Sequence, residues 1–445
     1  MSHKIGMVSL GCPKNQVDAE RILAALKNAG FEITNNEADA EVIIVNTCGF
    51  IEAAKTESIE NIIEVAGFKQ SGNLKALVVT GCLAERYKDQ ILTEIPEVDC
   101  VVGIGSNENI VELINNALKG NKTAEFGSKT CLPLTGERIL TTPFYSAYLK
   151  VAEGCNNRCS YCAIPDIRGN FRSLPIEQCV SEATELANKG VKELIVVAQD
   201  TTNYGADLYG KPSLPALLKE LVKIDGIRWI RTLYTYPDKI TDELLDLLAN
   251  EAKLVPYLDI PIQHASDKIL RKMNRRGTKA EIEALLTKIR QKVPNITLRT
   301  SLITGFPGES EADFTELAEF VQWAKFDRLG CFAYSAEEDT PAAEFESQVD
   351  EQLRQDRSEI IMNDQMTIAA AKNSQKIGSE ILVLTEGYDP YIKCYFGRSE
   401  ADAPDIDGKV FFMSGEKLNE GDFVKVLVND TVEYDLLGEF LEVAE

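Results

Sequence analysis

The sequence predicts an α/β protein with three consecutive parts: an N-terminal doubly wound parallel α/β domain, a central (βα) barrel and a small C-terminal antiparallel β-barrel of OB-like size. Three observations predict this organisation. Strand-like apolar runs alternate with amphipathic helices over residues 1–120, and six further strand–helix repeats occupy residues 142–372. Residues 376–445 instead contain short strands between Gly, Asp and Asn turns, and residues 121–141 have the weak periodicity of a linker.

In the N-terminal domain, each apolar run precedes a helix-like segment. We expect strands over residues 5–10, 42–45, 76–80 and 101–102, and helices over residues 16–29, 51–66 and 108–118. The first three strands are each followed by a cysteine, namely Cys12, Cys48 and Cys82. Because the carboxyl ends of parallel strands meet at one edge of a sheet, we expect these cysteines to converge.

The second and third parts follow from the same patterns. Barrel strands are expected over residues 147–151, 194–198, 229–232, 257–260, 297–302 and 328–332, with helices over residues 175–189, 214–224, 242–250, 279–292 and 311–324. Six such repeats fit a partial or full barrel better than an open sheet. The last part should contain strands over residues 380–384, 392–396, 409–413 and 423–428.

Composition narrows the class of protein. The 445 residues include 47 Lys and Arg against 70 Asp and Glu, a net charge of −23, while 44% of them are hydrophobic. This balance is that of a globular protein, and it argues mildly against nucleic acid as the main partner. The first residues lack the pattern of a secretory signal, and no apolar run approaches the ~18 residues of a membrane span. We expect a soluble, cytoplasmic protein with no membrane partner.

The acidic excess is concentrated at the C-terminus. Residues 376–445 contain six basic and sixteen acidic residues, a balance of −10. An ordinary solvated surface is one explanation. OB-like appendages that bind oligonucleotides do so through basic faces, however, so this part is poorly suited to that role.

The strongest motif is a CxxxCxxC loop formed by Cys155, Cys159 and Cys162. Three thiolates at this spacing can hold a [4Fe-4S] cluster and leave its fourth iron open to another ligand. A zinc knuckle is the alternative, although zinc ribbons pair two CxxC units and no second unit is present. A disulfide framework is a poor explanation for the eleven cysteines of a chain without an export signal.

Three readings are open for Cys12, Cys48 and Cys82: buried structural thiols, a zinc site, or the ligands of a second cluster. Their place in strand-end loops beside glycines favours a ligand role over inert core packing. Five further cysteines lack ligand spacing and are predicted to be structural, namely Cys100, Cys131, Cys179, Cys331 and Cys394.

A CxxxCxxC loop in front of βα repeats resembles that of radical S-adenosylmethionine (radical SAM) enzymes. The resemblance implies that the open iron binds the methionine moiety of the cofactor, whose sulfonium is then cleaved by an electron to give a deoxyadenosyl radical. Gln199 and Asp200 resemble the motif that meets the methionine amino group, and residues 301–309 resemble the strand end that lies against adenosine. The expected cofactor-binding residues are Gln199, Asp200, Gly305, Glu309 and Arg231.

Over essentially its full length the chain resembles the methylthiotransferase family. The three strand-end cysteines, the radical SAM barrel and a C-terminal TRAM domain all match, the last including residues 396–408. The resemblance implies two [4Fe-4S] clusters and two S-adenosylmethionine molecules per product, one as methyl donor and one as radical source. It also implies an electron donor protein as partner.

Several motifs resemble the protein-modifying, RimO-like branch of this family, which methylthiolates the β-carbon of an aspartate in a small-subunit ribosomal protein. The tRNA-modifying branch typically has Gln where Pro13 follows the first cysteine, and Ser where His264 stands. An acidic TRAM domain also suits a basic ribosomal protein better than tRNA. The rival hypotheses are a tRNA methylthiotransferase and, in another class, a non-catalytic iron–sulfur electron carrier or ribosome-binding factor.

No catalytic residue is assigned from the sequence. His264 is considered for such a role, with a satisfied barrel-lining histidine as the alternative. The chain departs from the family pattern at positions that carry no proposed ligand: Ala19, Leu174, Ala336 and Asp339 stand where Ser, Arg, Pro and Gly are usual.

Overall fold

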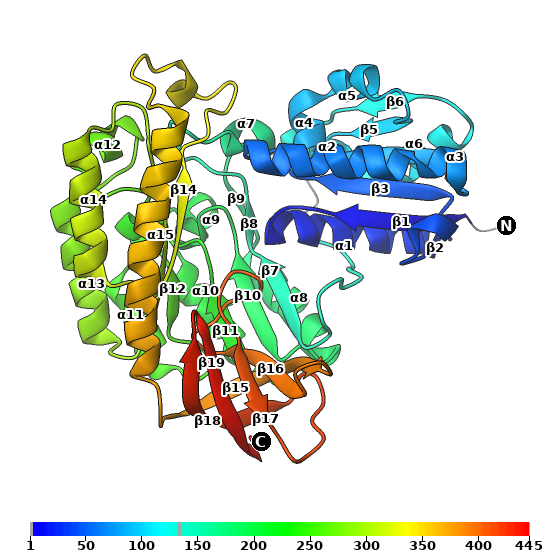
Figure 1. The fold of residues 1–445 in the computed structure, drawn as a ribbon. Coiled ribbons are helices and arrows are strands. Elements are labelled where there is room, and N and C mark those ends of the chain that lie inside the picture. The colour runs from blue at the N-terminus through cyan, green and yellow to red at the C-terminus, as the bar shows by residue number, and fades with distance from the viewer. Residues whose placement is uncertain (1–2, 132–134, 445) are drawn as a thin grey trace.

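The computed structural model describes residues 3–131 and 135–444. The N-terminal domain is a six-stranded parallel sheet of order β2-β1-β3-β4-β5-β6, with helices packed on both faces (Figure 1). Its strands are β1 (Lys4–Ser9), β2 (Glu32–Ile33), β3 (Val42–Thr47), β4 (Ala76–Gly81), β5 (Cys100–Val102) and β6 (Thr123–Glu125). Its main helices are α1 (Pro13–Asn28), α2 (Glu52–Ala66), α4 (Cys82–Tyr87), α5 (Asp89–Glu94) and α6 (Ile110–Leu118). The doubly wound domain predicted from the sequence is therefore confirmed.

The apolar faces of these helices explain their placement. Ile62 of α2 and Leu83 of α4 pack on one side of the sheet, while Ile22 of α1 and Leu113 of α6 pack on the other. The sequence pattern did not predict β2 or β6. Strand β6 lies within residues 121–141, which were expected to form a linker. Both are edge strands of two or three residues, too short to show an alternating pattern.

The central part contains the six predicted parallel strands. They are β7 (Ser146–Lys150), β10 (Glu193–Val197), β11 (Trp229–Thr232), β12 (Tyr257–Asp259), β13 (Thr297–Thr304) and β14 (Arg328–Ala333). Within the described residues they form two three-stranded sheets, β7-β10-β11 and β12-β13-β14, joined by an isolated bridge between Ile230 and Leu254. The result is a partial barrel surrounded by α8 (Ile176–Asn188), α10 (Leu214–Leu221), α11 (Asp242–Asn250), α13 (Lys279–Lys292) and α14 (Glu311–Ala324).

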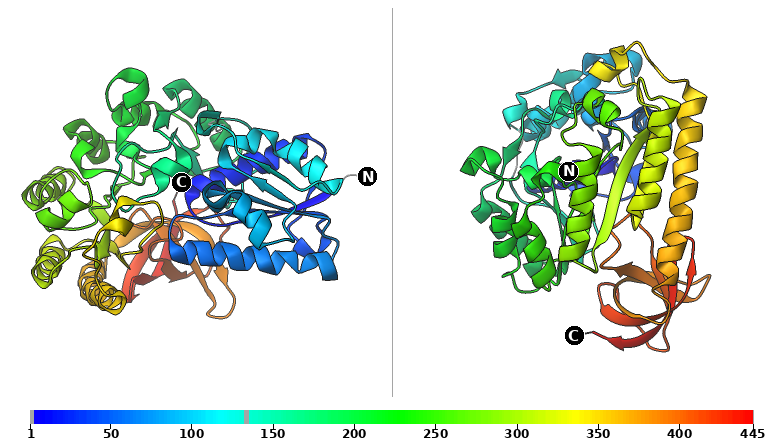
Figure 2. Two further views of the ribbon diagram at one scale, coloured as in Figure 1. Left: turned by 90° about the horizontal axis from the view of Figure 1, so that it is seen from above. Right: turned by 90° about the vertical axis from the view of Figure 1, so that its left-hand side faces the viewer.

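A further long helix, α15 (Glu351–Ser374), packs on β14 and runs past the barrel to the C-terminal domain (Figure 2). The sequence pattern did not predict this helix. Its buried face mixes Ile361, Ile368 and Ala369 with Arg357, Ser358, Gln365 and Asn373, so polar residues interrupt the apolar stripe by which amphipathic helices are recognised. Among the described residues, none of the helices is long and apolar enough to cross a membrane.

The C-terminal domain is a closed five-stranded barrel of order β15-β16-β17-β19-β18. Its strands are β15 (Glu380–Asp389), β16 (Cys394–Ser399), β17 (Val410–Met413), β18 (Phe423–Val432) and β19 (Asp435–Val443). The small barrel is as predicted, but β17 and β19 run parallel, so it is not wholly antiparallel. The sequence pattern did not predict β19 either, because only Leu436 of this strand is fully buried and acidic residues are frequent in it.

This small barrel covers the amino ends of the central strands (Figure 1). Arg398 is almost completely buried and donates hydrogen bonds of 3.1 and 2.5 Å to the carboxylate of Glu193, the first residue of β10. Arg328 at the start of β14 pairs with Asp402 at 2.5 Å, and the Tyr257 hydroxyl at the start of β12 donates to Asp407 at 2.6 Å. The TRAM-like segment of residues 396–408 therefore contacts the barrel.

The Glu193 pair predicts an acid-sensitive interface. Burial alone would raise the pKa of this carboxyl, but the charges of Arg398 and Arg231 outweigh it and lower the pKa from 4.5 to about 2. A depressed pKa stabilises the fold above about pH 4.5, and that contribution is lost as the pH falls towards 2. We expect up to about 3 kcal/mol of stability to be lost in this window.

Thermal unfolding measured between pH 7 and 3 checks this expectation. In a Glu193→Gln variant, the same decrease in pH should cost less stability, because the titrating group is absent. An equal acid sensitivity of the variant and the parent protein would contradict the prediction.

Candidate functional site

Three cysteines follow three neighbouring strands at the same edge of the N-terminal sheet. In the register, Ser9 of β1 pairs with Asn46 of β3, which pairs with Thr80 of β4. Cys12, Cys48 and Cys82 come three, two and two residues after these partners. The strands that carry them are adjacent, as their sequence positions predicted.

The loop that carries Cys12 contacts the loop that carries Cys48 closely. Gly11 has φ +91°, and a Cβ atom there would lie 2.8 Å from Cys48 Cβ and 3.1 Å from Cys48 Sγ, so only glycine fits. Asn15 fastens the same loops, because its Nδ2 donates to the carbonyls of Leu10 at 2.8 Å and Thr47 at 3.2 Å. The loops of Cys12 and Cys48 are thus held together by the close approach at Gly11 and by the hydrogen bonds of the Asn15 side chain.

The three thiols of this set differ in acidity. Burial raises the pKa of Cys48, and it raises the pKa of Cys82 to about 12. Burial also acts to raise the pKa of Cys12, but the charges of Lys14 and Arg168 outweigh it, and the net pKa is lowered. Metal ions bind thiolates, so a metal bound here would have to displace protons from Cys48 and Cys82.

The CxxxCxxC loop lies between the short strand β8 (Ala152–Glu153) and helix α7 (Ile164–Arg168). Its three cysteines are partly exposed, and burial raises the pKa of Cys155 and Cys162. Polar groups surround the sulfur atoms. The Asn157 N–H donates to Cys155 Sγ at 3.5 Å, and Cys159 Sγ lies 3.9 Å from Nη1 of Arg275 and 3.7 Å from the hydroxyl of Tyr236.

These residues fit iron–sulfur clusters better than a single metal ion. All six cysteines are free thiols. Among the described residues, no three Cys, His, Asp or Glu side chains are arranged to hold one metal ion. In a cubane cluster each thiolate binds a different iron, so the three ligands need not converge on one point. Hydrogen-bond donors directed at cysteine sulfur, as at Cys155 and Cys159, are also typical of such clusters.

The predicted pair Gln199 and Asp200 lies beside the CxxxCxxC loop. Asp200 Oδ2 accepts hydrogen bonds from Asn157 Nδ2 at 2.9 Å and from Lys239 Nζ at 2.6 Å, so it fastens the cysteine loop to the barrel. Gln199 Nε2 donates to Glu153 Oε1 at 2.8 Å. Its Oε1 is buried without a hydrogen-bond partner, and such an atom is suited to accept a bond from a ligand.

Gly305, Glu309 and His264 form one buried group. Glu309 accepts hydrogen bonds from the Gly305 N–H at 2.9 Å and Arg357 Nη1 at 2.8 Å, and it lies 3.2 Å from His264 Nε2. The Ser266 N–H donates to His264 Nδ1 at 3.0 Å, so the ring proton belongs on Nε2, facing Glu309. Both ring nitrogens are engaged and the ring is fully buried. These contacts are those of a buried histidine whose hydrogen bonds are satisfied.

The space beside Gly305 is filled by the protein itself. A Cβ atom at this position, where φ is +67°, would lie 2.2 Å from Cγ of Arg354 on α15. The packing of α15 against the strand end is therefore enough to require glycine at this position, which the sequence predicted to bind the cofactor.

Arg231 was expected to bind the cofactor, and the structure places it elsewhere. Its Nε donates to Glu193 Oε1 at 3.2 Å, and its Nη1 donates to the carbonyl of Glu400 in the C-terminal domain at 2.8 Å. The side chain is fully buried at this interface. We therefore assign Arg231 to the contact between the two barrels. Its position on a barrel strand did not reveal towards which end of the barrel its side chain turns.

A carboxylate pair that sequence reasoning missed joins the N-terminal domain to the barrel. Glu337 accepts a hydrogen bond from Arg86 Nη1 at 2.9 Å and pairs with Lys55 at 3.2 Å, while the Tyr87 hydroxyl donates to Glu338 at 2.9 Å. The signals in the sequence were the departures at Ala336 and Asp339, which flank this pair. Asp339 has a φ of +62°, a backbone conformation that glycine adopts most readily.

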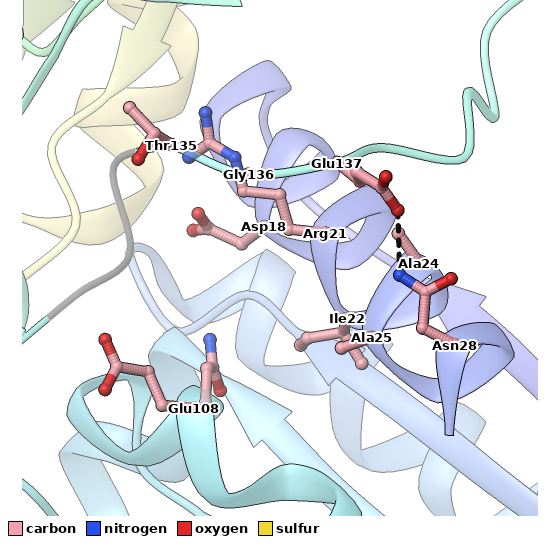
Figure 3. Close-up of a pocket in the computed structure, with 11 residues that line it drawn as sticks. Asp18, Arg21, Ile22, Ala24, Ala25, Asn28, Glu108, Thr135, Gly136 and Glu137 are labelled. Carbon is pink, nitrogen blue, oxygen red and sulfur yellow. Dashed lines mark hydrogen bonds between the residues drawn. The ribbon is translucent and has the colours of Figure 1, made fainter.

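A cavity of about 340 Å³ lies between α1 and the segment of residues 135–137 (Figure 3). Asn28 Nδ2 donates to Glu137 at 2.7 Å across its rim, and Asp18 and Arg21 line it. None of the described residues that line it is a cysteine, so it is distinct from the two cysteine sets. The side chain of Cys131, predicted to be structural, lies outside the described part of the chain.

Comparisons with known proteins agree with this geometry. Residues 149–321 match the radical SAM superfamily, residues 4–103 match the uncharacterized protein family UPF0004, and residues 377–441 match the TRAM domain. The radical SAM match implies a [4Fe-4S] cluster and S-adenosylmethionine. The radical S-adenosylmethionine methyltransferase TsrM from Kitasatospora setae covers 85% of this chain and 79% of its own, with a TM-score of 0.57 and 15% identity. That likeness concerns the fold alone.

Sequence relatives are much closer. The chain is 54% identical to the ribosomal protein uS12 methylthiotransferase RimO of Pelotomaculum thermopropionicum, over 99% of both chains. It is 48% identical to the enzyme of the same name from Clostridioides difficile, over 98% of this chain and 99% of that one. The chain therefore belongs to the RimO family of radical SAM methylthiotransferases.

Proposed function

We propose that this protein transfers a methylthio group to the β-carbon of an aspartate in ribosomal protein uS12, using two [4Fe-4S] clusters. One observation carries the proposal: two separate sets of three cysteines adjoin one another at the junction of the N-terminal domain and the barrel. Cys82 packs directly against Ala163 and Ile167, which follow Cys162. Relatives that share 48 to 54% of their residues with the chain carry the name of this activity.

The two sets would hold different clusters. Cys155, Cys159 and Cys162 would hold the first, and Cys12, Cys48 and Cys82 the second. When bound, the first would supply the electron that cleaves S-adenosylmethionine, and the second would hold the sulfur to be inserted. The chain's own residues support both: Arg275 and Tyr236 approach Cys159, while Lys14 and Arg168 place positive charge near Cys12.

The charge of the C-terminal barrel supports a basic protein as substrate. Of its six basic residues, Arg398 is buried against Glu193, which leaves only five to face a partner. Two of its sixteen acidic residues, Asp402 and Asp407, are engaged by the central barrel. The surface therefore remains strongly acidic. Such a surface attracts a Lys-rich and Arg-rich ribosomal protein and repels the phosphates of tRNA.

The proposed reaction also determines where the protein acts and what must supply its electron. A ribosomal substrate places the protein in the cytoplasm, where ribosomal proteins are made and assembled. Reductive cleavage of the cofactor also requires a partner, an electron donor protein, to supply the electron.

Mass spectrometry of a deletion strain tests the substrate. We expect uS12 from this strain to lose the added mass of a methylthio group on its aspartate, and the group should return when the gene is restored. Methylthio-nucleosides of tRNA should be unchanged. Loss of a tRNA methylthio-nucleoside with an intact aspartate modification would instead favour the tRNA-modifying reaction.

Anaerobic incubation with S-adenosylmethionine and a reductant separates an enzyme from an electron carrier. The reconstituted protein should release deoxyadenosine, and product should form when uS12 is added. If no deoxyadenosine forms although both clusters are present, the enzymatic proposal is wrong.

A further inference from the structure

A buried group of charges lies between the two cysteine sets. Glu153, two residues before Cys155, is completely buried and accepts hydrogen bonds from Lys150 Nζ at 2.7 Å and Arg168 Nη1 at 3.0 Å. Lys150 and Arg168 also pair with Asp18 on α1, at 3.0 Å for Arg168. Two cations and two carboxylates therefore balance one another in a buried position, an arrangement that holds each member in one place.

The position of Glu153 determines how the Gln199 amide is oriented. An ionised carboxylate can only accept hydrogen bonds, so it must face the amide nitrogen of Gln199 and not its oxygen. The observed contact is Nε2 to Oε1 at 2.8 Å. The amide oxygen of Gln199 consequently turns away from Glu153, and it is buried without a partner.

An unpartnered buried oxygen is costly, because it has lost its hydrogen bonds to water. A ligand with a donor group that binds beside this oxygen would restore the missing hydrogen bond. The Gln199 side chain lies beside the start of the CxxxCxxC loop, since its amide nitrogen donates to Glu153, two residues before Cys155.

We infer that Glu153 is a positioning residue for the cofactor: by holding the Gln199 nitrogen, it presents the Gln199 oxygen to the ammonium group of S-adenosylmethionine. The inference rests on the proposed function, which supplies the cofactor. It extends that function to a residue that acts through Gln199. It also connects cofactor binding to docking of the N-terminal domain, because Asp18 of α1 belongs to the same charge group.

The direct test is the affinity of the reconstituted, unreduced protein for S-adenosylmethionine, measured by anaerobic titration calorimetry. Gln199→Met removes the acceptor at nearly constant volume and should weaken binding roughly tenfold or more, the value of one charge-assisted hydrogen bond. Glu153→Gln allows the Gln199 amide to turn over and should weaken binding to a similar degree.

The double variant separates positioning from a general structural role. If Glu153 acts through Gln199, then Glu153→Gln should have almost no further effect on affinity in a Gln199→Met background. Independent effects that add in the double variant would overturn the inference. So would a Glu153→Gln protein that binds S-adenosylmethionine as tightly as the parent.

Controls distinguish the remaining outcomes. Gln365→Met changes another buried glutamine with an unpartnered oxygen. It lies on α15, outside both cysteine sets, and the variant should leave the affinity unchanged. Iron content should be equal in all variants compared. If Glu153→Gln does not fold, Glu153→Asp keeps the charge beside Lys150 and Arg168 but withdraws it from Gln199, and it should also weaken binding. A parent protein that holds both clusters but binds no S-adenosylmethionine would refute the proposed function itself.

Discussion

Replacing Cys159 by Ala is expected to abolish both deoxyadenosine formation and methylthio transfer, and to remove about half of the bound iron. Cys159 is the central cysteine of the CxxxCxxC loop, and its sulfur is approached by Arg275 and Tyr236. Two thiols do not hold a cluster that needs three, whereas the set at Cys12 stands on a separate sheet edge and should remain intact. Iron content and deoxyadenosine release measure the two effects.

Cys179→Ala is the matched control for this variant. Cys179 is fully buried in α8, within the hydrophobic core of the barrel, and its substitution changes packing without touching either cysteine set. It should keep the full iron content and measurable activity. If Cys159→Ala retains all of the iron, or still releases deoxyadenosine at the parent rate, the ligand assignment is wrong.

Replacing Cys82 by Ala is expected to separate the two halves of the reaction. The variant should lose the iron of the N-terminal set and all methylthio product. It should still cleave S-adenosylmethionine to deoxyadenosine, since the CxxxCxxC loop is unchanged. Cys82 opens helix α4 directly after β4 and packs against Ile104, Ala163 and Ile167, so the loss of its small side chain leaves most of these contacts in place.

Cys100→Ala provides the control in the same sheet. Cys100 lies buried in β5, and the Thr123 hydroxyl donates a hydrogen bond to its sulfur at 3.2 Å, so its contacts are structural. It should retain both the iron and the methylthio product. Formation of methylthiolated uS12 by the Cys82→Ala protein would show that the N-terminal cysteines do not handle the inserted sulfur.

The C-terminal domain changes the interpretation of the acidic charge. The TRAM-like segment of residues 396–408 forms hydrogen bonds and ion pairs with the central barrel through Arg398, Asp402 and Asp407. Any partner must therefore meet the faces of this domain that point away from the barrel. The acidic excess there still favours a basic protein, but it is carried by residues outside the segment by which the domain was recognised.

Local patterns predicted most of the architecture. The alternation of apolar and polar residues identified the main parallel strands and most helices, because this periodicity is present within each segment. It failed for β2 and β6, which are too short, for β19, which is rich in acidic residues, and for α15, whose buried face mixes polar and apolar residues. In each of these, tertiary contacts and not local pattern stabilise the element.

The sequence by itself determined the chemistry, since the spacing of Cys155, Cys159 and Cys162 and the strand-end positions of the other three cysteines are properties of the chain. Only the tertiary structure decided what the charged residues do. It turned Arg231 towards the C-terminal domain, placed His264 in a buried hydrogen-bond group, and paired Asp18 with Arg168, 150 positions away. Buried charges require partners, and folding supplies those partners from distant segments that no local pattern connects.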